Sequence, residues 1–163
     1  MRQLELQTEK IKAHVDGGVG WITFNQPEKR NAVSFAMWKA IPEIIADFST
    51  SDDVRVVVLK GAGDKAFVSG ADISEFEEVR NTPEQIATYE AATGAANAAL
   101  RTLEKPLIAM IRGFAMGGGL ITAMRADLRV ASDDSQFGIP AARLGIGYGY
   151  DGVRQLMELV GPA

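Results

Sequence analysis

The sequence predicts an α/β fold, and three observations lead to that prediction. Apolar, β-branched runs alternate with stretches of helical periodicity in the order strand, helix, strand, helix, strand, which implies crossover connections. The 163 residues are 47% hydrophobic and 23% charged, which suits a globular protein with a sizeable core. No internal repeat, low-complexity tract or linker interrupts the chain. We therefore expect one domain over residues 1–163.

The chain opens with a predicted hairpin. Two alternating runs, near 9–15 and 18–24, flank a glycine-containing turn at 16–18, which is the pattern of two antiparallel strands. His14 is the only histidine and falls within the first run, so we interpret it as a structural strand residue. A Ser-His-Asp triad or a multi-histidine metal site would have to be built around it.

Two long helices are predicted from periodicity and start signals. Apolar residues at helical spacing predict the first helix within 31–50, with Ser34 as its N-cap. Pro42 inside this pattern indicates either a kink or two shorter pieces. The second helix is expected at 82–105, where a Thr-Pro-Glu sequence marks its beginning.

Three apolar strands complete the pattern. The β-branched run at 54–61 is typical of a strand that is buried on both faces. A second strand is expected at 106–114 and a third at 127–132. A short helix at 150–161 closes the sequence.

Composition excludes several kinds of function. The 17 basic and 21 acidic residues give a net charge of −4, and no stretch concentrates Lys and Arg among aromatics, so a nucleic-acid partner is not expected. The absence of cysteine excludes disulfides, thiolate metal sites and a cysteine nucleophile, and we expect no metal. The polar N-terminus lacks an apolar signal core, and no window reaches the ~18 apolar residues of a membrane span, so we expect a cytoplasmic protein.

Three consecutive glycines, Gly117 to Gly119, stand between an apolar strand and a predicted helix. The first amides of a helix have no partner within the helix, and a glycine lets a ligand oxygen approach them. The segment is therefore a candidate site for an anion or a polarised carbonyl oxygen. Close helix–strand packing is an alternative reason for the glycines. The glycine spacing does not match a dinucleotide fingerprint, and no lysine follows as a Walker loop requires.

A second glycine-containing element, 64–76, also follows a buried strand. Residues 69–72 read as a turn that leads into a short helix, with Asp72 near the start of that helix. The plain alternative is a loop with an N-cap. Because ligands bind at the carboxyl edge of an α/β sheet, these two elements could supply two main-chain donors to one oxygen, which is an oxyanion hole.

These motifs carry a family resemblance. "KAFVSGADI", followed some forty residues later by "IRGFAMGGGL" and then by "ADLRVASDDSQFGIP", resembles the crotonase superfamily, whose best-known members are the enoyl-CoA hydratases. The resemblance runs from "VGWITFNQPEKRNAV" to the last residue. It implies a spiral of ββα units, usually assembled as trimers or hexamers. It also implies that the helical C-terminal region of such proteins is absent here, so that 1–163 looks like a truncated acyl-CoA-binding core domain.

The resemblance assigns roles to individual residues. The amides of Ala71 and Gly118 would bind the carbonyl oxygen of a coenzyme A thioester, which is a substrate rather than a permanent cofactor. The resemblance places the coenzyme A contacts at Lys29, Arg30, Ala32, Lys65 and Phe67. The remaining substrate contacts around the two motifs would be Gly70, Asp72, Ile73 and Gly117.

Catalysis is where the sequence departs from the hydratases. These enzymes use two glutamates as general acid and base, and the matching positions here are Ile121 and Ala141, which cannot transfer a proton. Asp151 is a candidate base if burial raises its pKa, and also a candidate helix N-cap. Tyr148 and Tyr150 are candidates for substrate contact or for packing.

The sequence thus favours an acyl-CoA enzyme of the enoyl-CoA hydratase group that stabilises a thioester enolate. One alternative is an isomerase, or other thioester-enolate chemistry with a different acid and base. Another is a degenerate member that binds acyl-CoA, or assembles with partners, without catalysis.

Overall fold

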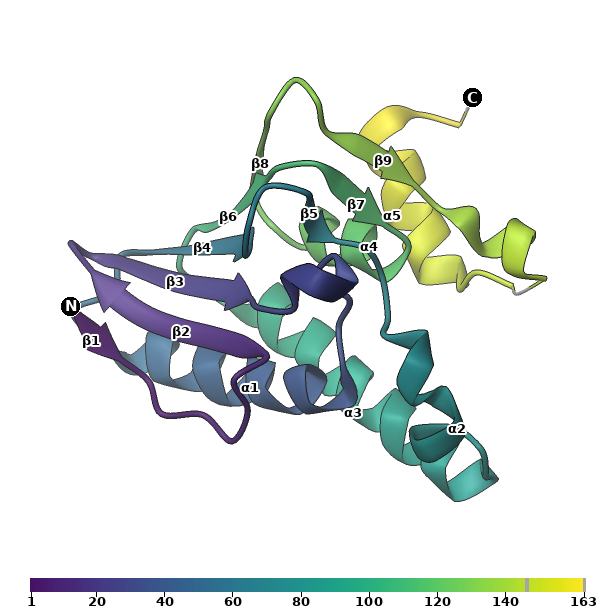
Figure 1. Cartoon of the computed structure of the whole chain (residues 1–163). Helices are drawn as coiled ribbons and strands as arrows, with labels where there is room; N and C mark the ends of the chain where they lie inside the picture. The colour runs from purple at the N-terminus through teal and green to yellow at the C-terminus, as the bar shows by residue number, and fades with distance from the viewer. Residues whose placement is uncertain (146, 163) are drawn as a thin grey trace.

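A computed structural model describes residues 1–145 and 147–162 (Figure 1). Its larger sheet has six strands in the order β1-β2-β3-β4-β6-β8. The strands β1, β2 and β3 pair in antiparallel fashion, whereas β3, β4, β6 and β8 are parallel. The bounds of these strands are β1 Arg2–Gln3, β2 Ile11–Asp16, β3 Val19–Phe24, β4 Val56–Gly61, β6 Leu107–Ile111 and β8 Leu128–Ala131.

The predicted hairpin is confirmed as β2 and β3, paired from Ile11 opposite Phe24 to Asp16 opposite Val19. Gly17 and Gly18 turn the chain with φ values of 58° and 87°. His14 lies in β2 and stacks on the Trp21 ring at 6.2 Å, which agrees with a strand role.

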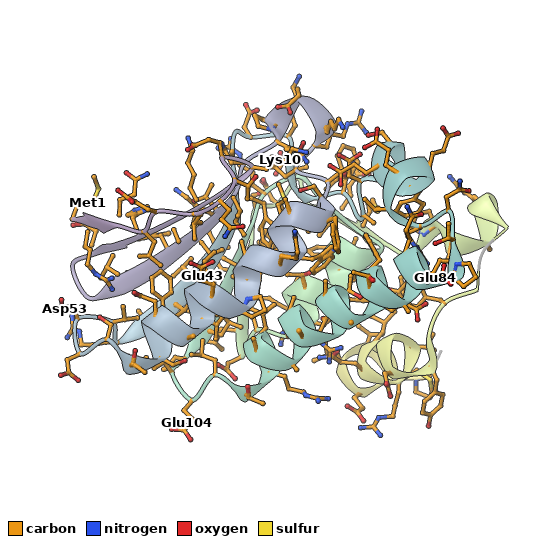
Figure 2. All side chains as sticks on the ribbon, turned by 90° about the horizontal axis from the view of Figure 1, so that it is seen from below. Met1, Lys10, Glu43, Asp53, Glu84 and Glu104 are labelled. Carbon is orange, nitrogen blue, oxygen red and sulfur yellow. The ribbon has the colours of Figure 1, made fainter. Side chains whose placement is uncertain are left out.

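Helices cover one face of the larger sheet. Figure 1 shows α1 (Phe35–Thr50) and α3 (Pro83–Thr102) below it, and the view from below in Figure 2 shows the two helices side by side. Ser34 caps α1 as predicted, and α1 is continuous through Pro42, so the division into two pieces is not needed. Thr82 caps α3 in a reciprocal capping box with Gln85. The fully buried side chains between these helices and the sheet include Phe24, Ile22, Ile41, Ile44, Phe48 and Leu59.

A second, three-stranded sheet, in the order β5-β7-β9, was not predicted. Each of its parallel strands comes directly after a strand of the larger sheet, so the chain forms successive β–β–helix units, as the spiral fold requires. Its strands are β5 Ala66–Val68, β7 Phe114–Met116 and β9 Gln136–Gly138. The single strand expected over 106–114 is therefore corrected to β6 and β7, because the chain turns at Gly113, which has a φ of 66°.

Short helical segments connect these units and position the site. The α-helices are α2 Phe76–Val79, α4 Gly118–Met124 and α5 Tyr150–Val160, and the 3-10 turns are η1 Pro27–Lys29, η2 Ile73–Glu75 and η3 Pro140–Leu144. None of the helices in the described part of the chain has both the length and the apolar composition needed to cross a membrane.

Candidate active site

A bridge between two segments that are far apart in the sequence sets the direction in which the main-chain amide of Ala71 points. The amide of Val33 donates to the Gly70 carbonyl at 2.8 Å, and the amide of Asp72 donates to the Val33 carbonyl at 2.9 Å. Val33 and Ala71 thus form an isolated parallel bridge. In this pattern the neighbours of Ala71 make the bridge bonds, and the N–H of Ala71 itself points to the other side.

Each of the three consecutive glycines has its own structural reason. Gly117 has φ 52° and ψ −118°, a conformation that side chains disfavour, and its amide donates to the Gly138 carbonyl at 2.8 Å. Gly118 is the first residue of α4. Gly119 is buried against β5, where a Cβ would lie 2.7 Å from the carbonyl carbon of Val68 and closer still to its oxygen. The packing explanation therefore holds for Gly119, and the turn explains Gly117.

Gly118 and Ala71 lie next to each other although 47 positions separate them. A Cβ at position 118 would stand 3.9 Å from the Ala71 nitrogen. Within residues 1–145 and 147–162, no acceptor takes the amide hydrogen of either residue. Because main-chain donors away from solvent almost always have partners, two neighbouring free amides at one cavity indicate a place for a ligand acceptor.

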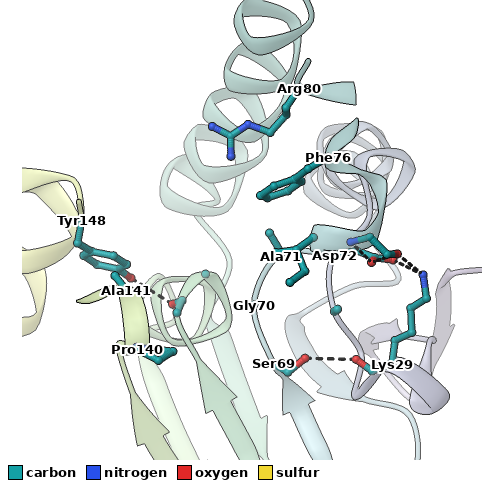
Figure 3. A pocket seen from close by; sticks show the side chains of 15 residues that line it. Lys29, Ser69, Gly70, Ala71, Asp72, Phe76, Arg80, Pro140, Ala141 and Tyr148 are labelled. Atoms are coloured by element: carbon teal, nitrogen blue, oxygen red, sulfur yellow. Dashed lines mark hydrogen bonds and ion pairs between the residues drawn. The ribbon is translucent and has the colours of Figure 1, made fainter. Parts of the chain in front are cut away.

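Both residues line a cavity of about 570 Å³, large enough for a small-molecule ligand (Figure 3). Its walls are mainly apolar, with a few polar groups. The lining residues are Lys29, Ala32, Ser69, Gly70, Ala71, Asp72, Ile73, Ser74, Phe76, Arg80, Gly117, Gly118, Pro140, Ala141 and Tyr148.

One wall of the cavity carries a complete ion pair. The ammonium of Lys29 donates to Asp72 Oδ2 at 2.8 Å and to Ser74 Oγ at 2.7 Å. The Asp72 side chain is only 3% exposed and also accepts from the Ser74 hydroxyl and amide through Oδ1. Burial alone would raise the pKa of Asp72, but the hydrogen bonds from Lys29 and Ser74 bring it below its ordinary value. Asp72 is thus held as a paired carboxylate.

Tyr148 closes the opposite wall. Its hydroxyl donates to the Gly117 carbonyl at 3.1 Å, and burial raises the pKa of Tyr148 to about 12. The ring packs against Gly152 of α5, where a Cβ would lie 2.8 Å from Tyr148 Cε1 and 3.3 Å from Ile121 Cδ1. The phenol is therefore a neutral donor that supports the Gly117 turn.

The structure brings most of the expected site residues into this cavity. Those that line it are Lys29, Ala32, Gly70, Ala71, Asp72, Ile73, Gly117, Gly118, Ala141 and Tyr148. Arg30 and Lys65 instead line a separate hollow beside Phe114. Phe67 is fully buried and packs edge-on against Phe24, so its side chain does not face a ligand.

The catalytic candidates on α5 do not reach the cavity. Tyr150 is 76% exposed, and Asp151 is also exposed and lies outside the lining. Asp151 is not the N-cap either: α5 begins at Tyr150, with Gly149 at the cap position. Ile121 lies behind the wall, against α5.

Sequence reasoning missed five lining residues: Ser69, Ser74, Phe76, Arg80 and Pro140. Phe76 and Arg80 had a detectable signal. They are four positions apart just after the first glycine motif, the spacing that places two side chains on one helical face.

Comparison with known proteins identifies the family. Residues 14–163 match the sequence profile described as enoyl-CoA hydratase/isomerase. The chain belongs to this family. Similar members of the enoyl-CoA hydratase/isomerase family include the short-chain-enoyl-CoA hydratase of Clostridium acetobutylicum, 40% identical over 156 residues, which are 96% of this chain and 59% of that protein. The crotonyl-CoA hydratase of Syntrophomonas wolfei is 33% identical, over 85% of this chain and 52% of that protein.

Solved family structures have the same fold. An enoyl-CoA hydratase/carnithine racemase from Magnetospirillum magneticum superimposes with a TM-score of 0.89 at 32% identity, covering 98% of this chain and 59% of that one. An enoyl-CoA hydratase from Bacillus anthracis gives 0.86 at 29% identity, covering 95% and 60%. The crotonase-like fold is therefore confirmed. The chain spans little more than half the length of these relatives.

Proposed function

We propose that this chain binds a coenzyme A thioester and stabilises its enolate, as an enzyme of the enoyl-CoA hydratase group. One observation carries the proposal: the free amides of Ala71 and Gly118 are neighbours in one cavity. A thioester carbonyl oxygen that accepts both hydrogen bonds becomes a better site for negative charge. The loss of one such donor typically costs about 10²- to 10³-fold in rate.

The proposed reaction is the addition of water to a 2-enoyl thioester. The water oxygen bonds to the β-carbon and the water gives up one proton, while the π electrons of the double bond move through the α-carbon to the thioester oxygen. The carbonyl then re-forms as the α-carbon takes up one proton, so that OH and H are added overall. The two amides act on the charge that develops at the oxygen. Isomerisation of a 3-enoyl thioester adds no water: the α-carbon loses a proton, a dienolate forms with its charge on the thioester oxygen, and the γ-carbon takes up a proton. The same two amides would stabilise that charge.

The groups that could serve as acid and base in the cavity are the reason for a second candidate function. Among the described residues, the ionisable groups that line the cavity are Lys29, Asp72, Arg80 and Tyr148. Asp72 is held in an ion pair, and Tyr148 donates to the main chain, so neither stands free to exchange a proton with water. This favours, as the alternative, a protein that binds acyl-CoA without turnover.

Further parts of the proposal concern the rest of the ligand and the assembly. Arg30 and Lys65, which line a separate hollow together with Asp64 and Asp134, would meet the phosphates of coenzyme A. A homo-trimer or hexamer would cover Leu128 and Val130, the exposed apolar side chains of β8. Light scattering would measure the number of chains in the assembly. Two statements stay predictions: that residues 1–163 form one acyl-CoA-binding domain, and that the protein is located in the cytoplasm.

The test uses crotonyl-CoA with wild type and Gly118→Pro. Proline is tolerated at the first position of a helix, and it removes the amide hydrogen in question. We expect wild type to hydrate crotonyl-CoA and Gly118→Pro to lose about 10²-fold or more of kcat/KM. Equal activity of the two would remove Gly118 from the proposal. Binding of crotonyl-CoA without turnover, in wild type and over a panel of other thioesters, would instead establish the alternative.

The infrared frequency of the bound thioester carbonyl gives a readout that needs no turnover. Two hydrogen bonds to the oxygen weaken the C=O bond, so we expect its stretch to move to lower frequency on wild type. On Gly118→Pro the frequency should return toward that of free crotonyl-CoA.

A further inference from the structure

Arg80 is a cation of the cavity that has no counter-charge among the residues that the structure describes. Its guanidinium has five N–H donors, and within the described residues none of them finds a hydrogen-bond acceptor or a carboxylate. Lys29, the other basic residue of the lining, is already neutralised by Asp72. The site therefore holds one paired and one unpaired positive charge.

Two aromatic rings hold Arg80 through cation–π contacts. Its Cζ lies 4.8 Å from the ring centre of Phe76 and 4.9 Å from that of Tyr89. A cation–π contact supplies no oxygen acceptor, so the N–H groups of the guanidinium stay available to a ligand. Tyr89 is itself held, because Trp38 Nε1 donates to its hydroxyl at 3.2 Å. Arg80 is half-buried and held by these contacts, and no carboxylate in the described part of the chain pairs with it.

The arrangement separates the two basic residues. In Figure 3, Arg80 and Lys29 lie at opposite ends of the drawn cavity, with Ala71 between them. Arg30 and Lys65 line a separate hollow and not the cavity itself. If the thioester oxygen lies at Ala71 and Gly118 and the coenzyme A arm leaves on the side of Lys29, the far end of the acyl group points toward Arg80.

We propose that Arg80 determines substrate specificity by binding a carboxylate at the distal end of the acyl group, so that the preferred ligands are coenzyme A thioesters of dicarboxylic acids. The inference rests on the proposed acyl-CoA function. A guanidinium edge and a carboxylate match in a two-point hydrogen-bonded pair. The apolar walls strengthen such a pair by keeping water out. A neutral acyl end leaves Arg80 unpaired, and a cationic end is repelled.

Two saturated ligands of the same shape test this without turnover. Glutaryl-CoA ends in a carboxylate, and 5-methylhexanoyl-CoA carries an isopropyl group in its place. Both contain the same coenzyme A, so the ratio of their dissociation constants reports on the acyl end alone. By titration calorimetry we expect wild type to bind glutaryl-CoA about 10- to 100-fold more tightly.

Variants then assign that preference to Arg80. Arg80→Met keeps a stem of similar shape without charge, and should bind the two ligands equally because its affinity for glutaryl-CoA falls. Arg80→Lys keeps the charge without the two-point geometry and should retain part of the preference. Arg55→Met is the control: this exposed arginine precedes β4, outside the cavity lining, and its loss should leave the ratio at the wild-type value.

The outcomes separate the two proposals. Equal binding of both thioesters by wild type, or a preference that survives in Arg80→Met, overturns the assignment to Arg80 and leaves the acyl-CoA function intact. Failure of wild type to bind either thioester overturns both proposals. Thermal melting confirms that each variant is folded, and Arg80→Lys decides the assignment should Arg80→Met not fold.

Discussion

The same substitution at two neighbouring glycines is expected to have opposite consequences. At position 118 an alanine Cβ would have Ala71 N, 3.9 Å away, as its nearest neighbour, which is ordinary van der Waals contact. At position 119 it would meet the Val68 main chain and side chain, at 2.7 Å from the carbonyl carbon and 2.8 Å from Cβ. Val68 is fully buried and cannot move aside.

These distances set the expected magnitudes. Forcing a methyl into a filled site costs typically 1–3 kcal/mol, and because main chain is involved we expect about 3 kcal/mol for Gly119→Ala. For a protein of this size that lowers Tm by about 6–12 °C. Gly118→Ala should leave the free energy of unfolding unchanged or raise it by up to about 1 kcal/mol, because alanine restricts the unfolded chain.

The effects on activity should be the reverse of the effects on stability, with the larger loss in Gly118→Ala. An oxygen bound by Ala71 has to lie about 2.7–3.1 Å from its nitrogen, and the methyl of Gly118→Ala would stand beside that place. We expect a loss of about 10- to 100-fold in affinity or kcat/KM for crotonyl-CoA, smaller than the effect of removing a donor outright. At a temperature where it is folded, Gly119→Ala should keep more of its activity than Gly118→Ala.

Thermal unfolding by circular dichroism and crotonyl-CoA assays on the three proteins provide the measurement. Wild-type binding and turnover in Gly118→Ala would show that no ligand oxygen lies beside Ala71. An unchanged Tm in Gly119→Ala would show that the approach of α4 to β5 is looser than described.

Three further predictions concern polar groups around the site. Asn31→Ala should cost about 3 kcal/mol in urea unfolding, because its buried side chain serves three main-chain groups, at Ala62, Ala66 and Gln26; a loss below about 1 kcal/mol would contradict this. The pKa of Asp72 is lowered by Lys29, so its stabilising effect is present above about pH 4 and is lost as the pH falls below that value. The difference in unfolding free energy between wild type and Asp72→Asn should therefore shrink in acid, and a constant difference would disprove the ion pair's role. Tyr148, whose pKa is about 12, stabilises the fold below pH 10 and loses this effect as the pH rises toward 12. Absorbance titration should show a phenol step near 12 that Tyr148→Phe lacks, and a step near 10 in its place would exclude the burial of this ring.

The sequence predicted the long elements because their signals are redundant. The helix α1 has a buried apolar face from Met37 to Phe48 and a capping serine, and α3 has a capping box. The strands β5, β7 and β9 have three residues each, which is too short for an alternating pattern to be recognised. The second sheet therefore comes only from the structure and the family.

The site, like the fold, could be predicted only where a local sequence pattern marks it. Glycines mark the two loops, but the free amide of Ala71 depends on a bridge to Val33, 38 positions earlier, which no local pattern shows. Asp151 was a candidate because of its charge, yet its exposure depends on how α5 packs against Tyr148. Arg80 was overlooked because its significance lies in the partners it lacks.

A crystal structure of this chain with crotonyl-CoA tests the central claim most directly. The account predicts that the thioester oxygen lies within about 3.1 Å of both the Ala71 and the Gly118 nitrogens. A bound thioester whose oxygen accepts from neither amide would contradict it.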